Sequence, residues 1–123
     1  VEKVVKAGAQ RIGHGINSIY NEKLLLKLKQ EKILLEICPT SNVQTNAVKS
    51  YSTHPIKKLY EKGIYLNINT DNNTVSNITL TEEYIKLYQI FNFTIEDFKK
   101  MNRMALEKSF IKEEIKEKLK KAI

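Results

Sequence analysis

The sequence is poor in cysteine, proline and glycine, has no tryptophan and contains no long apolar run. Its one thiol, Cys38, cannot form an internal disulfide, which favours a reducing, cytoplasmic compartment. Without about 18 consecutive apolar residues, the chain is not expected to cross a membrane. Histidine and aspartate are also scarce, with two of each and no H-x-H or C-x-x-C pair. These residues alone therefore do not supply the three protein ligands of a complete catalytic zinc site.

Positive charge exceeds negative charge, with 21 Lys and Arg against 14 Asp and Glu and a net charge of +7. Nearly all of the basic residues are lysines, and they are scattered among glutamates along the predicted helices. Proteins that read nucleic acids favour clustered arginines and exposed aromatic residues, so no nucleic-acid partner is expected. We interpret the abundance of Lys, Asn and Ile as the codon bias of an AT-rich genome.

Short apolar segments alternate with amphipathic helices, which is typical of an α/β fold built from βαβ units around a parallel sheet. Asn21 is expected to cap the helix that follows the first strand, and Pro39 to stop the second strand before a polar loop. Capping-box patterns at 79–82 and 94–97 predict the starts of two later helices. The expected strands are 11–15, 33–39 and 64–70, and the expected helices are 21–32, 54–63, 79–91, one starting near 94, and 111–123.

The first residues, VEKVVKAGAQ, have the helical spacing of Val1, Val4 and Val5 and an expected helix end at Gly8. They lack the apolar centre of a signal peptide and indicate a helix that is entered partway. At 123 residues the chain is also short for a barrel enzyme, which is typically about 250 residues long. We therefore expect residues 1–123 to be one partial domain of a longer protein.

Chemically suggestive residues follow each predicted strand. His14 follows the first strand, Cys38 to Asn42 follow the second, and Asp71 and Asn72 follow the third. In a parallel α/β sheet the carboxyl ends of the strands lie at one edge, where loops build the active site. We therefore expect these three groups to converge.

Each of these residues also has an ordinary structural explanation. His14 lies between two glycines and could cap a turn, and Asp71 could form a turn or cap a helix. Cys38 is expected to be a small buried hydrophobe rather than a nucleophile, since no basic partner lies near it in the sequence. His54, which precedes a proline, fits a loop histidine near a helix start. Two methionines at helical spacing, Met101 and Met104, are expected to pack in or near the core.

Taken together, the segments RIGHGINS, EICPTSNVQT, HPIKKLYEKGI and NTDNNTVSNITLTEEY resemble, in this order and spacing, the C-terminal part of adenosine deaminases. The resemblance runs through essentially all of the chain, and CPTSNVQT favours the adenosine branch over the adenine and AMP deaminases. It implies a zinc-dependent amidohydrolase of the TIM-type (β/α)8 barrel class. The three strands would be strands six to eight of that barrel, followed by its C-terminal helices.

The resemblance also implies roles for three residues. Asp71 matches the aspartate that ligates zinc and orients the attacking water. His14 matches the histidine that holds the zinc-bound hydroxide and stabilises charge as it adds to the purine. Asn72 stands where the family usually has a second aspartate, in NTDD, which hydrogen-bonds a purine ring nitrogen.

The other parts of such a site would lie in strands one to five, which these 123 residues do not include. They are the H-x-H zinc pair, a third zinc histidine and the glutamate that protonates the purine. The expected function is therefore that of the C-terminal segment of an enzyme that hydrolyses adenosine and 2'-deoxyadenosine to inosines and ammonia in purine metabolism. The chain by itself is expected to be inactive.

Two alternatives remain open at the sequence level. The chain could be a non-catalytic, degenerate remnant that self-associates, because three strands of a barrel leave two open edges. A weaker alternative is a small nucleoside-binding module.

Overall fold

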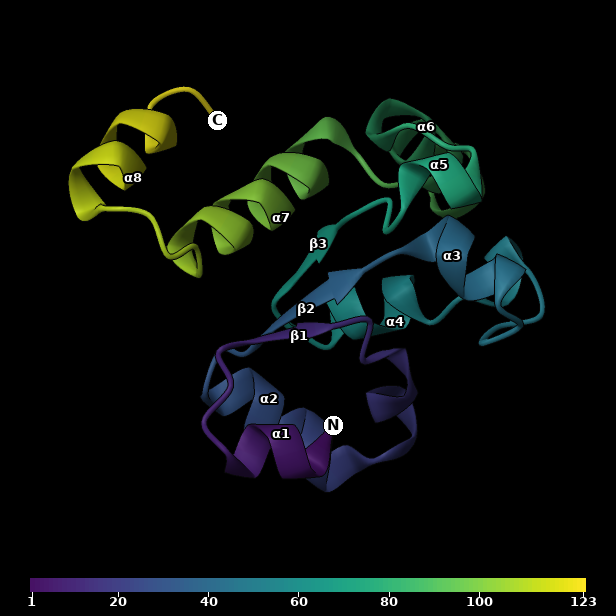
Figure 1. Cartoon of the computed structure of the whole chain (residues 1–123), viewed down its shortest axis with the longest axis horizontal. Coiled ribbons are helices and arrows are strands. Elements are labelled where there is room, and N and C mark those ends of the chain that lie inside the picture. Colours follow the sequence, from purple (N-terminus) through teal and green to yellow (C-terminus); the bar gives the residue numbers. More distant parts are fainter.

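The computed structural model describes residues 1–123, and the chain forms three short parallel strands surrounded by helices (Figure 1). None of the helices combines the length and the apolar character that crossing a bilayer requires. The elements are α1 (Glu2–Lys6), β1 (Arg11–Gly13), a 3-10 turn (Ile16–Tyr20), α2 (Glu22–Gln30), β2 (Leu34–Ile37), α3 (Pro39–Gln44), a second 3-10 turn (Tyr51–Thr53), α4 (Ile56–Glu61), β3 (Leu66–Ile68), α5 (Asn73–Ser76), α6 (Leu80–Phe91), α7 (Ile95–Glu107) and α8 (Glu113–Lys120).

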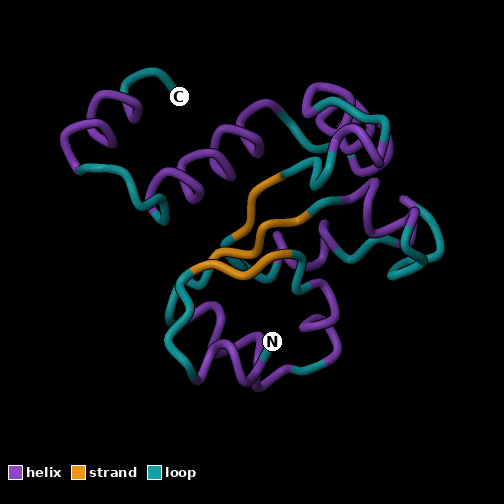
Figure 2. The backbone as a smooth tube through the Cα atoms, viewed as in Figure 1, coloured by secondary structure: helices purple, strands orange, loops and turns teal.

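The strands lie in the order β1-β2-β3 and form a fully parallel sheet at the centre of the molecule (Figure 2). In register, Ile12 lies beside Leu35, and Leu35 beside Leu66. All three are buried in one hydrophobic core, because neighbours in register share a face of the sheet. By the same alternation, Glu36 and Asn67 lie on the opposite, more polar face.

Local sequence signals account for the starts of three helices. The Asn21 side chain accepts a hydrogen bond from the backbone N–H of Leu24 and so caps α2. Thr79 and Thr94 each form a reciprocal capping box, with Glu82 and Asp97 respectively, at the starts of α6 and α7. These caps satisfy backbone N–H groups that have no partner within the helix. The three predicted helix starts are confirmed.

The structure corrects other boundaries. All three strands end earlier than predicted, and the second and third also begin later, because the parallel ladder pairs only three or four residues of each strand. The predicted polar loop after the second strand begins with α3, since Pro39 occupies the first turn of a helix, where its missing N–H costs nothing. The short helix α5 was not predicted, and α4 and α8 are shorter than 54–63 and 111–123.

The core extends from the sheet into the C-terminal helices. Met101 and Met104 on α7 are buried, as predicted, and Phe93 before α7 is fully buried. Helix α7 packs against β3, and α8 packs against α7 (Figure 1). The third strand and the helices after it therefore belong to one packed body.

We predict that the isolated chain self-associates. The outer edges of β1 and β3 have no paired strand, and Tyr20, Val75 and Phe110 are each more than three-quarters exposed. Unpaired edges and exposed apolar side chains both promote association. Sedimentation velocity should show dimers or larger species that grow with concentration. A monomer at all concentrations would contradict this prediction.

Candidate active site

Two predicted site residues lie at the carboxyl edge of the sheet. His14 directly follows β1, and its N–H continues the ladder by donating to Glu36 O at 2.8 Å. Asp71 follows β3 after two residues. Both have left-handed backbone conformations, with φ of 59° and 60°, which costs a non-glycine residue about 1 kcal/mol or more.

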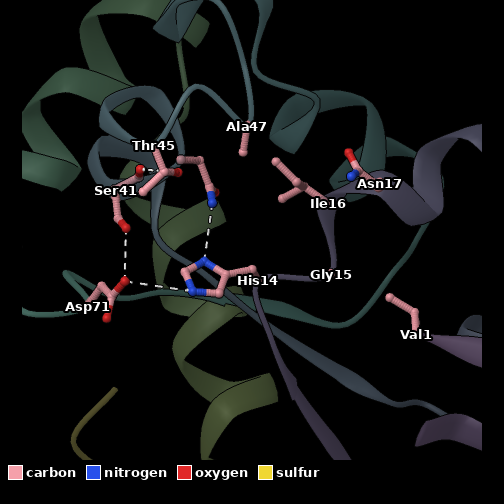
Figure 3. Close-up of a pocket in the computed structure, with 10 residues that line it drawn as sticks. Val1, His14, Gly15, Ile16, Asn17, Ser41, Thr45, Ala47 and Asp71 are labelled. Carbon is pink, nitrogen blue, oxygen red and sulfur yellow. Dashed lines mark hydrogen bonds and ion pairs between the residues drawn. The ribbon is translucent and has the colours of Figure 1, made fainter. Parts of the chain in front are cut away.

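The side chains of these two residues meet, although they come from opposite edges of the sheet (Figure 3). His14 Nε2 lies 3.7 Å from Asp71 Oδ2, and both side chains are a little under half exposed. Ser41 Oγ donates a hydrogen bond to the same carboxylate oxygen at 2.8 Å. The imidazole and the carboxylate are therefore close to each other and accessible to a ligand.

Helix α3 braces this pair from the middle strand. It places Ser41 against Asp71 and Asn42 against His14, where Asn42 Nδ2 lies 3.1 Å from His14 Nδ1. The first turn of α3 is held in turn by Glu83 on α6, whose Oε1 accepts a hydrogen bond from Thr40 N–H at 2.9 Å. Glu83 is fully buried, and burial raises the pKa of its carboxyl.

His54 lies behind Asn42 in the loop just before α4, as predicted, and it is buried. Its Nε2 lies 3.0 Å from Asn42 Oδ1, and its Nδ1 accepts a hydrogen bond from the Ile56 N–H at 3.1 Å. Burial lowers the pKa of His54 to about 4. The ring is therefore neutral at physiological pH.

A pocket of about 350 Å³ opens beside this network, a volume at the lower end of the range for small-molecule sites. Asn72 is not one of its lining residues. The Asn72 side chain is exposed, and its Oδ1 caps α5 by accepting a hydrogen bond from Val75 N–H. The pocket is lined by Val1, His14, Gly15, Ile16, Asn17, Ser41, Asn42, Thr45, Ala47 and Asp71.

Cys38 is buried at the end of β2, as predicted for a small hydrophobic residue. Burial, together with the nearby charges of Asp71 and Glu83, raises the pKa of its thiol to about 11. Very little thiolate therefore exists at neutral pH. We expect the folded chain to react with a thiol reagent such as DTNB far more slowly than the urea-unfolded chain. Equal rates would contradict this burial.

The donors at the site do not complete a metal shell. Imidazole nitrogen and carboxylate oxygen are ligand types that zinc accepts, but a catalytic zinc needs three protein ligands. No group of three or more His, Cys, Asp or Glu side chains in the structure could hold a metal ion. His14 and Asp71 can thus offer at most two of the ligands.

Sequence reasoning missed the contributions of Ser41, Asn42 and Glu83. It placed the first two at a strand end but in a loop, without partners. The sequence feature that could have indicated a helix here was Pro39, because proline is common in the first turn of a helix. No local signal connects Glu83 with Thr40, because that contact depends on the packing of α6 against α3.

The fold and the site together define a class of protein. The chain matches solved deaminases over nearly its whole length. The adenine deaminase from Arthrobacter aurescens has a TM-score of 0.92 at 22% identity, covering 98% of this chain and 37% of that one. The apo N6-methyl-AMP deaminase from Arabidopsis thaliana has a TM-score of 0.84 at 27% identity, covering 96% and 34%. The chain is therefore an α/β unit that corresponds to about a third of a barrel deaminase.

Sequence comparison identifies the family. The family model described as adenosine deaminase matches residues 1–123. The adenosine deaminase of Plasmodium gallinaceum is 56% identical over 113 residues, which cover 92% of this chain and 31% of that protein. The chain belongs to the adenosine deaminase family and spans about a third of the length of the curated relatives that it matches.

Proposed function

We propose that residues 1–123 are the C-terminal part of a zinc-dependent adenosine deaminase and supply strands six to eight of its barrel. The observation that carries this proposal is the meeting of His14 and Asp71, 3.7 Å apart at the carboxyl edge of the sheet, in a chain of this family. The complete enzyme would hydrolyse adenosine and 2'-deoxyadenosine to the inosines and ammonia. A related Arabidopsis protein, ADAL, has been solved in complex with IMP, which is consistent with a purine substrate.

Under this proposal, His14 and Asp71 act on the water that attacks the purine. Asp71 would ligate zinc through its carboxylate, which Ser41 holds in place by donating to Oδ2. His14 would hydrogen-bond the attacking oxygen and stabilise the charge that develops as it adds to the ring. The remaining zinc ligands would come from the part of the relatives that this chain does not match, so zinc chemistry is not assigned to this chain alone.

Fragment complementation tests the proposal. The chain would be co-expressed with the N-terminal part of the P. gallinaceum adenosine deaminase that lies outside the matched region; we call this assembly the completed barrel. With added zinc, the completed barrel should release ammonia from adenosine, whereas each part alone should not. Adenosine turnover by the isolated 123-residue chain would overturn the expectation that it is inactive.

A matched control separates the site from simple assembly. Asp71→Asn keeps the shape of the side chain and its ability to accept a hydrogen bond from Ser41, but it removes the charge that a zinc ligand supplies. The variant should therefore assemble but show no turnover. An assembled and fully active Asp71→Asn protein would exclude Asp71 as a zinc ligand.

Asn72→Asp is expected to raise activity in the completed barrel. A carboxylic acid at this position can donate a hydrogen bond to a purine ring nitrogen, and aspartate caps a helix as well as asparagine does. A recovered contact of about 1 to 3 kcal/mol corresponds to an increase in kcat/KM of about 5- to 150-fold. The neighbouring Asn73→Asp, which makes the same change of charge, should not have this effect. An unchanged rate for Asn72→Asp would mean that the substitution is neutral.

A further inference from the structure

His54 is a buried histidine behind the pocket that contacts neither Asp71 nor the open cavity. Its hydrogen bonds fix where its proton lies. Because Nδ1 accepts from the backbone N–H of Ile56, the proton of the neutral ring must be on Nε2. A backbone amide cannot reverse its role, so this tautomer is set by the chain fold itself.

The tautomer of His54 determines the orientation of the next side chain. Its Nε2–H points at Asn42 Oδ1, 3.0 Å away. The amide oxygen is the only side-chain atom of Asn42 that can accept this hydrogen bond. The amide nitrogen of Asn42 is therefore turned toward the pocket. There Asn42 Nδ2 donates to His14 Nδ1 at 3.1 Å.

The orientation of Asn42 then determines the tautomer of His14. A ring nitrogen that accepts a hydrogen bond carries no proton, so the neutral His14 ring has its proton on Nε2. That N–H faces Asp71 Oδ2, 3.7 Å away, on the open side of the ring. If Nε2 carried no proton, two hydrogen-bond acceptors, this ring nitrogen and Asp71 Oδ2, would face each other.

We propose that His54 and Asn42 are positioning residues that hold His14 as a hydrogen-bond donor at Nε2. This inference rests on the proposed function only for the identity of the reacting oxygen. It makes the role of His14 more specific, because an imidazole with its proton on Nε2 donates to an oxygen that becomes negative rather than removing a proton from it. The Ile56 amide, His54, Asn42 and His14 form one directed chain, in which each hydrogen bond sets the direction of the next.

Nuclear magnetic resonance of the 123-residue chain tests the proposal directly. Long-range proton–nitrogen correlation spectra distinguish a protonated ring nitrogen from a bare one. The chain has only two histidines, and a His54→Gln variant assigns their signals. At a pH about two units above the ordinary histidine value of about 6.5, both rings should carry their proton on Nε2. A proton on Nδ1 of either ring overturns the proposal.

Asn42→Asp is the informative variant. A carboxylate can still accept from His54 Nε2–H, but it cannot donate to His14 Nδ1, so the His14 proton should move to Nδ1. Glu83→Gln is the matched control: it changes a buried residue that holds the same helix but can still accept from Thr40 N–H. In Glu83→Gln the His14 proton should stay on Nε2. An unmoved proton in Asn42→Asp contradicts the proposal.

Turnover in the completed barrel gives a second readout. Asn42→Asp should lower kcat by about 10- to 100-fold, as for other residues that orient a reacting group, with a smaller change in KM, whereas Glu83→Gln should lower kcat much less. Equal losses in the two variants would indicate a merely structural role for Asn42. The spectra do not depend on catalysis, so inactivity of the completed barrel would remove the proposed function and leave the hydrogen-bond chain standing.

Discussion

His14→Ala in the completed barrel should lower kcat for adenosine by about 10²- to 10³-fold, with assembly and zinc content unchanged. The reason is the loss of the Nε2–H group that faces the pocket beside Asp71. Removing one donor aimed at developing negative charge typically has an effect of this size. Steady-state assays of inosine formation measure it.

A second substitution distinguishes a donor from a base at this position. The amide nitrogen of glutamine can approach the position of Nε2 and donate a hydrogen bond, but it cannot accept a proton. His14→Gln should therefore retain more activity than His14→Ala if His14 donates, and no more if it acts as a base. An alanine variant as active as the parent protein would exclude His14 from the reaction.

Acid should destabilise the folded chain through His54. The folded state keeps this ring neutral down to a pKa of about 4, whereas the ordinary value is 6.5. The unfolded chain therefore binds more protons between these values, and the free energy of unfolding falls as the pH decreases through this window. A shift of this size corresponds to about 3 kcal/mol, which is a large part of the stability of a small domain.

Urea unfolding at a series of pH values measures this loss, and the control is His54→Gln. Glutamine does not titrate, so the free energy of unfolding of the variant should vary much less between about pH 6.5 and pH 4. If the free energy of unfolding depended on pH in the same way in the parent and the variant, another group would be responsible for the acid sensitivity.

The sequence predicts those parts of the structure that depend on neighbouring residues. Caps at Asn21, Thr79 and Thr94 are local hydrogen bonds between residues three apart, and all three were predicted correctly. The predicted strands and helices also occur in the predicted order, because strand and helix periodicities differ over a few residues, but α3 and α5 were not predicted. Pro39 was misread because proline both ends strands and begins helices.

The candidate site depends on contacts that are distant along the chain. The sequence indicated that His14 and Asp71 would converge, because both follow parallel strands. It did not indicate that Asn42 and His54 lie behind them, since that depends on the direction in which α3 leaves β2. The buried Glu83 was unpredictable for the same reason. Its Oε2 has no hydrogen-bond partner in the structure, which costs stability, whereas its Oε1 holds the first turn of α3.

The order β1-β2-β3 has a consequence for how the chain folds. Each strand pairs with the strand that comes just before or just after it in the sequence. The loops to be closed before pairing are therefore short for a parallel sheet, which keeps the entropic barrier to forming the sheet low. His14 and Asp71 follow the two outer strands. Their approach therefore reports completion of the sheet, and a probe of that distance would follow the last step of its folding.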